Sequence, residues 1–155
     1  EPLLLDADAL NLIAQSKTLQ GQVTRRTGGT IITPHPTEAA RLLGISTAAV
    51  QDDRLRAARE LATRFNCAAV VKGAGTVVDD GQAATINATG NPLLATAGTG
   101  DVLAGMVGAL LAQGYLASDA ARIGVALHGA AADVLAARGV KRAVAGDIVG
   151  ELATL

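Results

Sequence analysis

The feature that most constrains the fold of this chain is a threefold repetition of a short apolar run, a polar or glycine-rich turn and a helical pattern. The apolar runs are Leu3–Leu5, Thr30–Thr33 and Ala68–Val71. Short buried runs separated by helical segments are typical of parallel strands covered by helices. The sequence therefore predicts an α/β fold in which these three runs are parallel strands of one sheet.

The middle of the chain predicts a long helix and a hairpin. Apolar residues recur at helical spacing over Thr47–Phe65, which indicates an amphipathic helix. Thr76–Asp79 and Gln82–Asn87 flank Asp80-Gly81, a pair that supplies the positive φ angles of a tight turn. These segments predict a hairpin, so the sheet is expected to be mixed.

The last third of the chain predicts a loop and three helices. After the loop over residues 88–98, two alanine- and glycine-rich helices are expected over Gly100–Gln113 and Ser118–Arg138. A glycine follows each of them, in the usual C-terminal position. Small residues on most faces of both helices indicate close packing and deep burial. A short final helix is expected over Ala145–Leu155.

Length and composition favour a single domain, because the chain has 155 residues of which 50% are hydrophobic. A net charge of −1, no Lys/Arg block and only two aromatic residues, Phe65 and Tyr115, argue against a nucleic-acid partner. No apolar stretch approaches the roughly 20 unbroken residues that span a bilayer, so no membrane partner is expected. The single Cys67 excludes an internal disulfide, fits a cytoplasmic location and is expected to be a small core residue.

A Gly-Thr-Gly-Asp turn at the start of the first apolar helix is the strongest sign of a binding site. Gly98, Thr99 and Gly100 leave backbone N–H groups uncovered where the helix begins, and helix N-termini bind phosphate through such groups. Asp101 beside them would act as a base or orient a cation in phosphoryl transfer. Alternatively, Asp101 caps the helix.

Ionisable residues follow the predicted parallel strands, at the edge where α/β sheets bind ligands. His35 stands between two prolines, which hold it in extended geometry; it is either a ligand contact or a turn residue. Glu38 falls in the first turn of the next helix, where it either favours the helix dipole or helps to bind magnesium. Lys72 precedes Gly73-Ala74-Gly75-Thr76 and offers a cation and exposed amides to a nucleotide, unless it is a surface lysine before the hairpin.

Three further ionisable residues are less informative. Asp6 and Asp8 follow the first strand and could order a loop or hold water on a metal; we expect the loop role for Asp6. His128 lies inside the second apolar helix and is expected to be a core histidine with satisfied hydrogen bonds.

Four segments, in this order, resemble the ADP/ATP-dependent NAD(P)H-hydrate dehydratases of the ribokinase-like superfamily. They are Asp6-Ala7-Asp8-Ala9-Leu10-Asn11, Thr33-Pro34-His35-Pro36-Thr37-Glu38, Lys72-Gly73-Ala74-Gly75-Thr76, and Gly90-Asn91-Pro92 leading to Gly98-Thr99-Gly100-Asp101-Val102-Leu103-Ala104-Gly105. The resemblance covers essentially the whole chain and implies that residues 1–155 are the C-terminal part of a ribokinase-like domain. It implies an enzyme in which a nucleotide, usually ADP in bacterial members, phosphorylates the ring hydroxyl of hydrated NADH or NADPH. Elimination of phosphate then returns the intact dihydronicotinamide.

The resemblance also implies a role for each motif residue. Asp101 would activate the substrate hydroxyl, and the amides around Gly98, Thr99 and Gly100 would form an anion hole. His35 would contact the hydrated nicotinamide nucleotide. Glu38 would help to organise Mg²⁺. The residues expected to bind ADP or ATP are Lys72, Gly73, Ala74, Gly75 and Thr76, together with Gly100.

The chain departs from the family pattern at two points. Leu93-Leu94 stand where the family usually has Gly-Met after Gly-Asn-Pro, which could reshape that loop. The chain also begins at the first apolar run, whereas family domains extend further on that side. A half-sheet would expose an apolar edge, so a homo-oligomer is expected. Two alternatives stay open: a ribokinase-like kinase acting on a vitamin-precursor hydroxyl, and a non-catalytic nucleotide-binding or assembly fragment.

Overall fold

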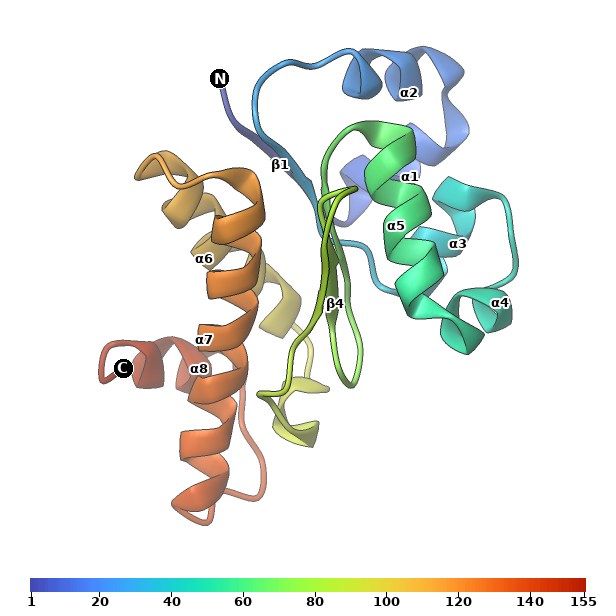
Figure 1. The fold of residues 1–155 in the computed structure, drawn as a ribbon. Coiled ribbons are helices and arrows are strands. Elements are labelled where there is room, and N and C mark those ends of the chain that lie inside the picture. The colour runs from blue at the N-terminus through green and yellow to red at the C-terminus, as the bar shows by residue number, and fades with distance from the viewer.

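Five strands form one mixed sheet in the computed structural model, which describes residues 1–155 (Figure 1). Their order in the sheet follows the chain: β1 (Leu3–Leu5), β2 (Thr30–Ile32), β3 (Ala68–Val71), β4 (Val77–Asp79) and β5 (Ala84–Ile86). The first three strands pair in parallel, and β4 and β5 add to them as an antiparallel hairpin. The predicted mixed sheet is confirmed. The carboxyl ends of β1, β2 and β3 therefore lie along one edge.

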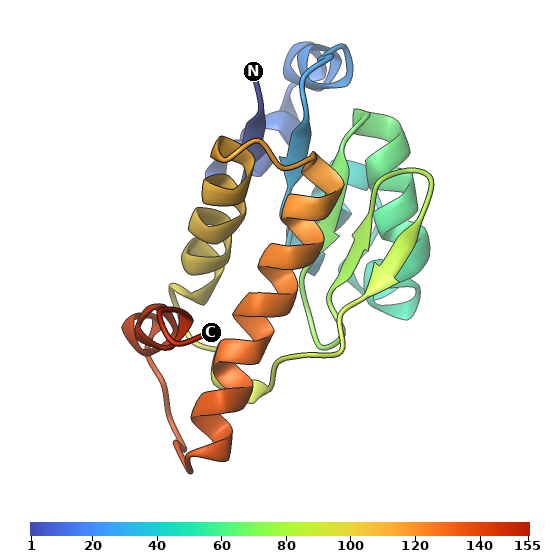
Figure 2. The same cartoon turned by 60° about the vertical axis from the view of Figure 1, so that its left-hand side comes forward.

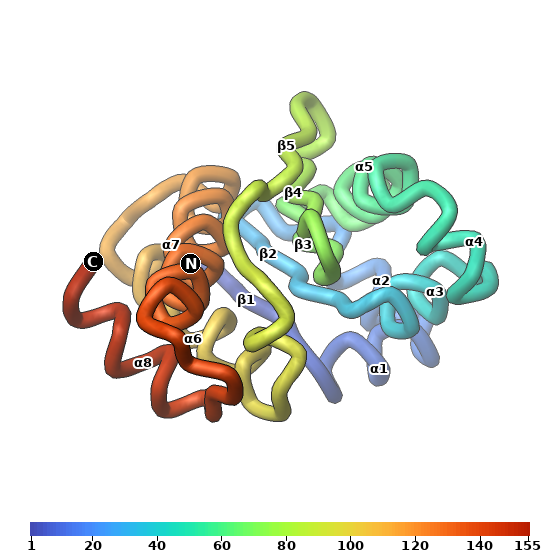
Figure 3. The backbone as a smooth tube through the Cα atoms, turned by 90° about the horizontal axis from the view of Figure 1, so that it is seen from below, coloured from blue at the N-terminus to red at the C-terminus, as the bar shows by residue number.

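Helices cover both faces of the sheet, as the views in Figures 2 and 3 show. The first layer contains α1 (Asp8–Gln15), α2 (Lys17–Thr24), α3 (Pro36–Leu43), α4 (Thr47–Asp52) and α5 (Arg54–Phe65). The second contains α6 (Thr99–Ala112), α7 (Ala117–Ala137) and α8 (Ala145–Leu152), preceded by the short 3₁₀ turn η1 (Pro92–Leu94). Strand side chains alternate between the layers: Ile32 and Val71 pack towards α1–α5, whereas Ile31 and Val70 pack towards α6 and α7.

Glycine allows α6 and α7 to pack closely. A Cβ on Gly124 of α7 would lie 2.5 Å from Cγ2 of Val107 on α6.

The helices α6 and α7 begin and end within one residue of the expected bounds. By length and composition α7 could cross a membrane; however, half of its most apolar stretch is buried within the protein, and a core helix passes the same test.

Four details of the predicted secondary structure are wrong. The third apolar run, Ala68–Val71, is followed by the hairpin of β4 and β5 rather than by a helix. The single helix expected over Thr47–Phe65 is interrupted at Asp53, whose side chain accepts the N–H of Arg56 at 2.9 Å and so caps a second helix. In the hairpin, only Gly81 has a positive φ, because the turn spans four residues and Asp80 accepts two backbone N–H groups within it. The last helix ends at Leu152 rather than Leu155.

Candidate functional site

The N-terminus of α6 presents open backbone donors. Gly98 precedes the helix with a φ of 86°, which a residue with a side chain rarely adopts. The N–H groups of Gly100 and Asp101 have no hydrogen-bond acceptor within the chain, whereas the N–H of Thr99 donates to the Thr96 carbonyl at 3.3 Å. The Asp101 side chain makes no hydrogen bond to a backbone amide there, so it does not act as the cap that the alternative interpretation required.

The Thr99 hydroxyl fixes the turn that leads into α6. Thr99 is 6% exposed, and its Oγ1 lies 2.7 Å from the Leu94 carbonyl oxygen and 2.8 Å from that of Thr96. The Thr96 hydroxyl in turn donates to the Leu93 carbonyl at 3.2 Å. These bonds tie the helix start to η1, so Thr99 contributes a side chain as well as the expected backbone position.

Lys72 joins the ends of the parallel strands to α6. Its Nζ lies 3.0 Å from Oδ1 of Asp6, directly after β1, and both side chains are largely buried. A Cβ built on Gly100 would lie 3.6 Å from the same Nζ. The expectation that strand-end residues meet at one edge is confirmed for this pair, and their partner across the edge is the glycine turn. Asp6 therefore holds the lysine rather than only ordering a loop. Asp8 opens α1 and is exposed.

His35 and Glu38 form a capping box at the start of α3. The His35 Nδ1 atom accepts N–H groups from Thr37 at 3.1 Å and Glu38 at 3.4 Å. In return, Oε2 of Glu38 accepts the His35 N–H at 2.8 Å, and Oε1 lies 3.4 Å from His35 Nε2. Glu38 is 5% exposed. Both of its oxygens thus face His35, and the expectation that Glu38 helps to organise Mg²⁺ stays a prediction.

Magnesium takes oxygen ligands, usually one or two carboxylates together with waters and substrate phosphates. The Glu38 carboxylate is engaged by the helix cap, so its contacts do not support the expected role in organising Mg²⁺. We assign no step to a metal. The His35 side chain is 48% exposed and remains accessible to a ligand.

The loop after β3 is closed by its own bonds and by a cation. The Thr76 hydroxyl accepts the N–H of Gly73 at 3.3 Å and donates to its carbonyl at 3.0 Å. The Arg54 guanidinium donates to the Ala74 carbonyl and occupies the space that a Cβ on Gly73 would need. The sequence analysis missed Arg54 because it treated α4 and α5 as one helix. Asp53 is a residue type that often caps helices, and this could have indicated that a new helix begins at Arg54.

His128 on α7 is buried beside the same helix start. It is 7% exposed and its Nε2 has no hydrogen-bond partner. Burial lowers the pKa of His128; a hydrogen bond with the Thr99 backbone opposes this shift, and the positive charge of Lys72 adds to it. The expectation of a core histidine is confirmed for its burial, but the expected satisfaction of its hydrogen bonds fails at Nε2.

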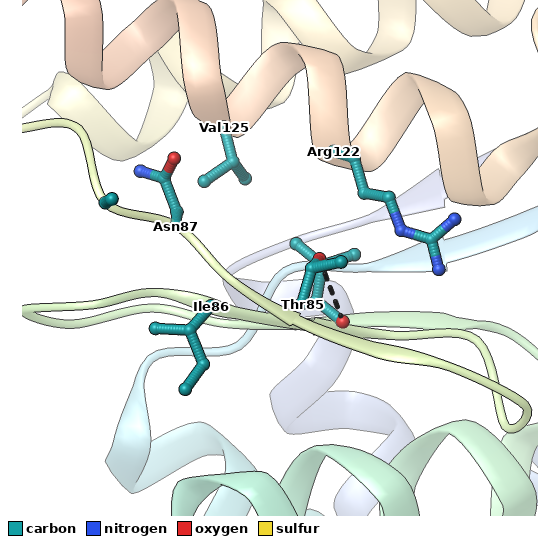
Figure 4. A pocket seen from close by; sticks show the side chains of 7 residues that line it. Thr85, Ile86, Asn87, Arg122 and Val125 are labelled. Atoms are coloured by element: carbon teal, nitrogen blue, oxygen red, sulfur yellow. Dashed lines mark hydrogen bonds between the residues drawn. The ribbon is translucent and has the colours of Figure 1, made fainter.

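A cavity of about 170 Å³ lies between the hairpin and α7 (Figure 4). Figure 4 shows Asn87 pointing towards Val125, with Arg122 at the other end of the cavity. The Nη2 atom of Arg122 donates to Oδ2 of Asp80 at 2.7 Å. The residues that line it are Val78, Thr85, Ile86, Asn87, Ala88, Arg122 and Val125. None of the residues of the strand-end cluster or of the start of α6 lines this cavity.

The arrangement suits chemistry on phosphate. Open amides at a helix N-terminus and the ammonium of Lys72 can stabilise an anion, and the exposed Asp101 carboxylate in the same turn can accept a proton. Positioning and charge stabilisation of this kind account for most catalysis of phosphoryl transfer.

Comparison with known proteins gives one consistent result. The sequence pattern of the NAD(P)H-hydrate dehydratase family matches residues 1–152. The chain is 45% identical, over 155 residues, to an ADP-dependent (S)-NAD(P)H-hydrate dehydratase from Neisseria meningitidis, covering 99% of this chain and 51% of that one. Among solved structures, an ADP/ATP-dependent NAD(P)H-hydrate dehydratase from Bacillus subtilis, co-crystallised with ATP/Mg²⁺, superposes with a TM-score of 0.84 at 31% identity, covering 99% of this chain and 53% of that one.

The same fold recurs in a ribokinase-like superfamily protein from Enterococcus faecalis, with a TM-score of 0.80, 27% identity and coverage of 99% of this chain and 51% of that one. The expected ribokinase-like α/β fold is thereby confirmed. The chain spans about half the length of each of these three proteins. Its sequence, its sheet and its glycine turn together show that the chain belongs to the NAD(P)H-hydrate dehydratase family.

Proposed function

We propose that this chain carries the phosphate-facing part of the site of an ADP- or ATP-dependent NAD(P)H-hydrate dehydratase. The observation that carries the proposal is the meeting of Lys72, Asp6 and Gly100 at the open N-terminus of α6. Membership of the family supplies the substrate: the relatives from Neisseria meningitidis and Bacillus subtilis are NAD(P)H-hydrate dehydratases by name.

In the proposed reaction, Asp101 removes the proton of the ring hydroxyl of hydrated NADH or NADPH. The hydroxyl oxygen forms a bond to the terminal phosphorus of the nucleotide, and the bond from that phosphorus to AMP, or to ADP when ATP is the donor, breaks. Loss of the new phosphate group from the ring, with a proton from the neighbouring carbon, restores the ring double bond. The products are NADH or NADPH, inorganic phosphate and the shortened nucleotide.

The remaining residues take supporting roles in this proposal. The open amides of Gly100 and Asp101, in the turn framed by Gly98 and Thr99, stabilise the anion that develops on the transferred phosphoryl group. Lys72 and the loop from Gly73 through Ala74 and Gly75 to Thr76 face the adenine nucleotide. His35 contacts the hydrated nicotinamide nucleotide from the end of β2.

We also propose that residues 1–155 form the C-terminal part of a larger domain. The chain spans 51% of the Neisseria meningitidis relative. In addition, β1 lies at the edge of the sheet with one side unpaired, beside an apolar groove of about 330 Å³. An edge strand of this kind can accept a further strand. The groove is lined mainly by Leu3, Leu5, Leu12, Ile13, Leu19 and Val23.

The test is an assay of the intact protein with NADH hydrate and ADP, following the near-ultraviolet absorbance that only restored NADH gives. Asp101→Asn should lower the rate by about 100-fold or more, because the base is lost. Asp52→Asn, an exposed aspartate on α4, is the matched control and should leave the rate unchanged. Accumulation of a stable phosphorylated alcohol without NADH would favour the kinase alternative and overturn the proposal.

A further inference from the structure

We propose that Asp133 on α7 is a positioning residue that holds the glycine turn at the start of α6 in its anion-binding geometry. It does so by accepting hydrogen bonds from Gly90 and Asn91, which form a corner of the loop before η1. The inference rests on the proposed function for its catalytic consequence. Its structural part can be tested independently.

Both carboxylate oxygens of Asp133 accept hydrogen bonds from this corner. Oδ2 accepts the N–H of Gly90 at 2.8 Å, and Oδ1 accepts Nδ2 of Asn91 at 2.9 Å. The other side-chain atom of Asn91, Oδ1, accepts the N–H of Leu93 at 3.0 Å and so caps η1. An aspartate 42 residues away thus fixes the orientation of the capping asparagine.

Close packing of the loop backbone against α7 adds to these hydrogen bonds. A Cβ on Gly129, one turn before Asp133 on the same helix, would lie 2.6 Å from the Thr89 carbonyl carbon. The Thr89 hydroxyl also donates to the carbonyl of Ala126 at 2.9 Å. The loop therefore lies directly on the backbone of α7, and only glycine permits that approach.

From this corner a continuous set of hydrogen bonds reaches the turn. Asn91 begins η1, the Leu94 carbonyl at its end accepts the Thr99 hydroxyl, and Thr99 opens α6. Leu93 and Leu94 pack in the same apolar cluster as Ala132 and Ile148, which anchors η1 against α7 and α8. A shift of the Gly90-Asn91 corner would therefore be transmitted to the amides of Gly100 and Asp101.

The donors and acceptors allow a sharp test, because the amide and the carboxylate can be exchanged. In Asp133→Asn, the new amide nitrogen faces the Asn91 amide nitrogen, and turning Asn91 over would point its nitrogen at the Leu93 N–H instead. Either orientation opposes two donors. In the double variant, Asp133→Asn with Asn91→Asp, every donor has an acceptor again. The amide oxygen introduced at position 133 accepts the Gly90 N–H, and the carboxylate introduced at position 91 accepts both the amide from position 133 and the Leu93 N–H.

The experiment measures hydrogen exchange and dehydratase kinetics on the intact protein for both single variants and the double variant. Asp119→Asn, the same change on an exposed residue of the same helix, is the matched control. Asp133→Asn should speed exchange at the hydrogen-bonded amides of Leu94, Ala95 and Thr99. It should lower kcat about tenfold, which is less than the roughly 100-fold loss expected for a misplacement of about 1 Å, and it should change KM for ADP less than kcat. The double variant should return both quantities close to wild type.

Three outcomes would overturn the inference. Exchange at the amides of Leu94, Ala95 and Thr99 that is unaffected by Asp133→Asn would show that the corner does not hold the turn. A double variant that regains thermal stability but not kcat would show a purely structural role. Equal kcat in wild type and Asp133→Asn would remove the catalytic consequence. If wild type itself lacks dehydratase activity, the proposed function fails, while the exchange measurement still decides the structural part.

Discussion

Replacing Thr99 by valine should destabilise the protein through one buried hydroxyl. Valine keeps the branched shape and removes the only donor that faces the Leu94 carbonyl, at a position that is 6% exposed. A net hydrogen bond contributes about 1 kcal/mol, and leaving a buried acceptor unpaired costs about 1–3 kcal/mol. In the variant, the Thr96 carbonyl still accepts the Thr99 N–H at 3.3 Å, so only the Leu94 carbonyl loses its donor. We therefore expect a loss of about 2 kcal/mol.

The measurement is equilibrium unfolding in urea, followed by circular dichroism. With an m-value of about 2 kcal/mol per molar urea, the midpoint should fall by about 1 M. Thr99→Ser is the control, since it keeps the hydroxyl and loses one methyl group, which costs about 0.8 kcal/mol. It should also retain ADP binding, whereas Thr99→Val weakens it. A valine variant that unfolds at the wild-type midpoint, or a serine variant that unfolds earlier than the valine variant, would refute the reasoning.

Three further predictions concern other parts of the fold. Gly129→Ala places a Cβ 2.1 Å from the Thr89 hydroxyl and should cost about 2 kcal/mol or more, whereas Gly108→Ala meets nothing within 4 Å and should gain about 0.5–1 kcal/mol; thermal unfolding of the two compares them. Because burial lowers the pKa of His128, the unfolded chain binds the extra proton, so stability should be full above about pH 6.5 and fall as the pH drops towards the folded pKa. Urea titrations of His128→Gln should show a flatter profile in that range, and an unchanged slope would contradict the assignment. Burial raises the pKa of Cys67 to about 12, so a thiol reagent at about pH 8 should label it only after unfolding, and labelling of the native protein at the unfolded rate would show otherwise.

Local patterns predicted most of the fold. The three apolar runs became β1, β2 and β3 because each is long enough only for a buried strand; a helix follows each of the first two, and the hairpin follows the third. The break at Asp53 could not be seen in the same way, since the apolar spacing of α4 continues into α5. The non-helical backbone of Asp53, with φ −146° and ψ 81°, and its capping bond to Arg56 separate the two helices.

The candidate site was predictable where it depends on strand ends and not where it depends on distant pairs. The edge shared by β1 and β3 predicted that Asp6 and Lys72 would lie near one another, although not that they would form an ion pair. The sequence position of Glu38 fits a helix cap and a metal site equally well, and only the structure shows that both of its oxygens contact His35 in a cap. The contact between Gly90 and Asp133 spans 43 residues and leaves no local pattern.

The order of the strands has a consequence for how the protein is made. All five strands lie beside their neighbours in the sequence, so this sheet can grow one strand at a time from β1 to β5 as the chain leaves the ribosome. The glycine turn has no such independence, because its support comes from α7, which is synthesised later. We expect a nascent chain that ends before residue 133 to have an ordered sheet but an unformed anion site. The chain would therefore bind nucleotide only after the final helices have been synthesised.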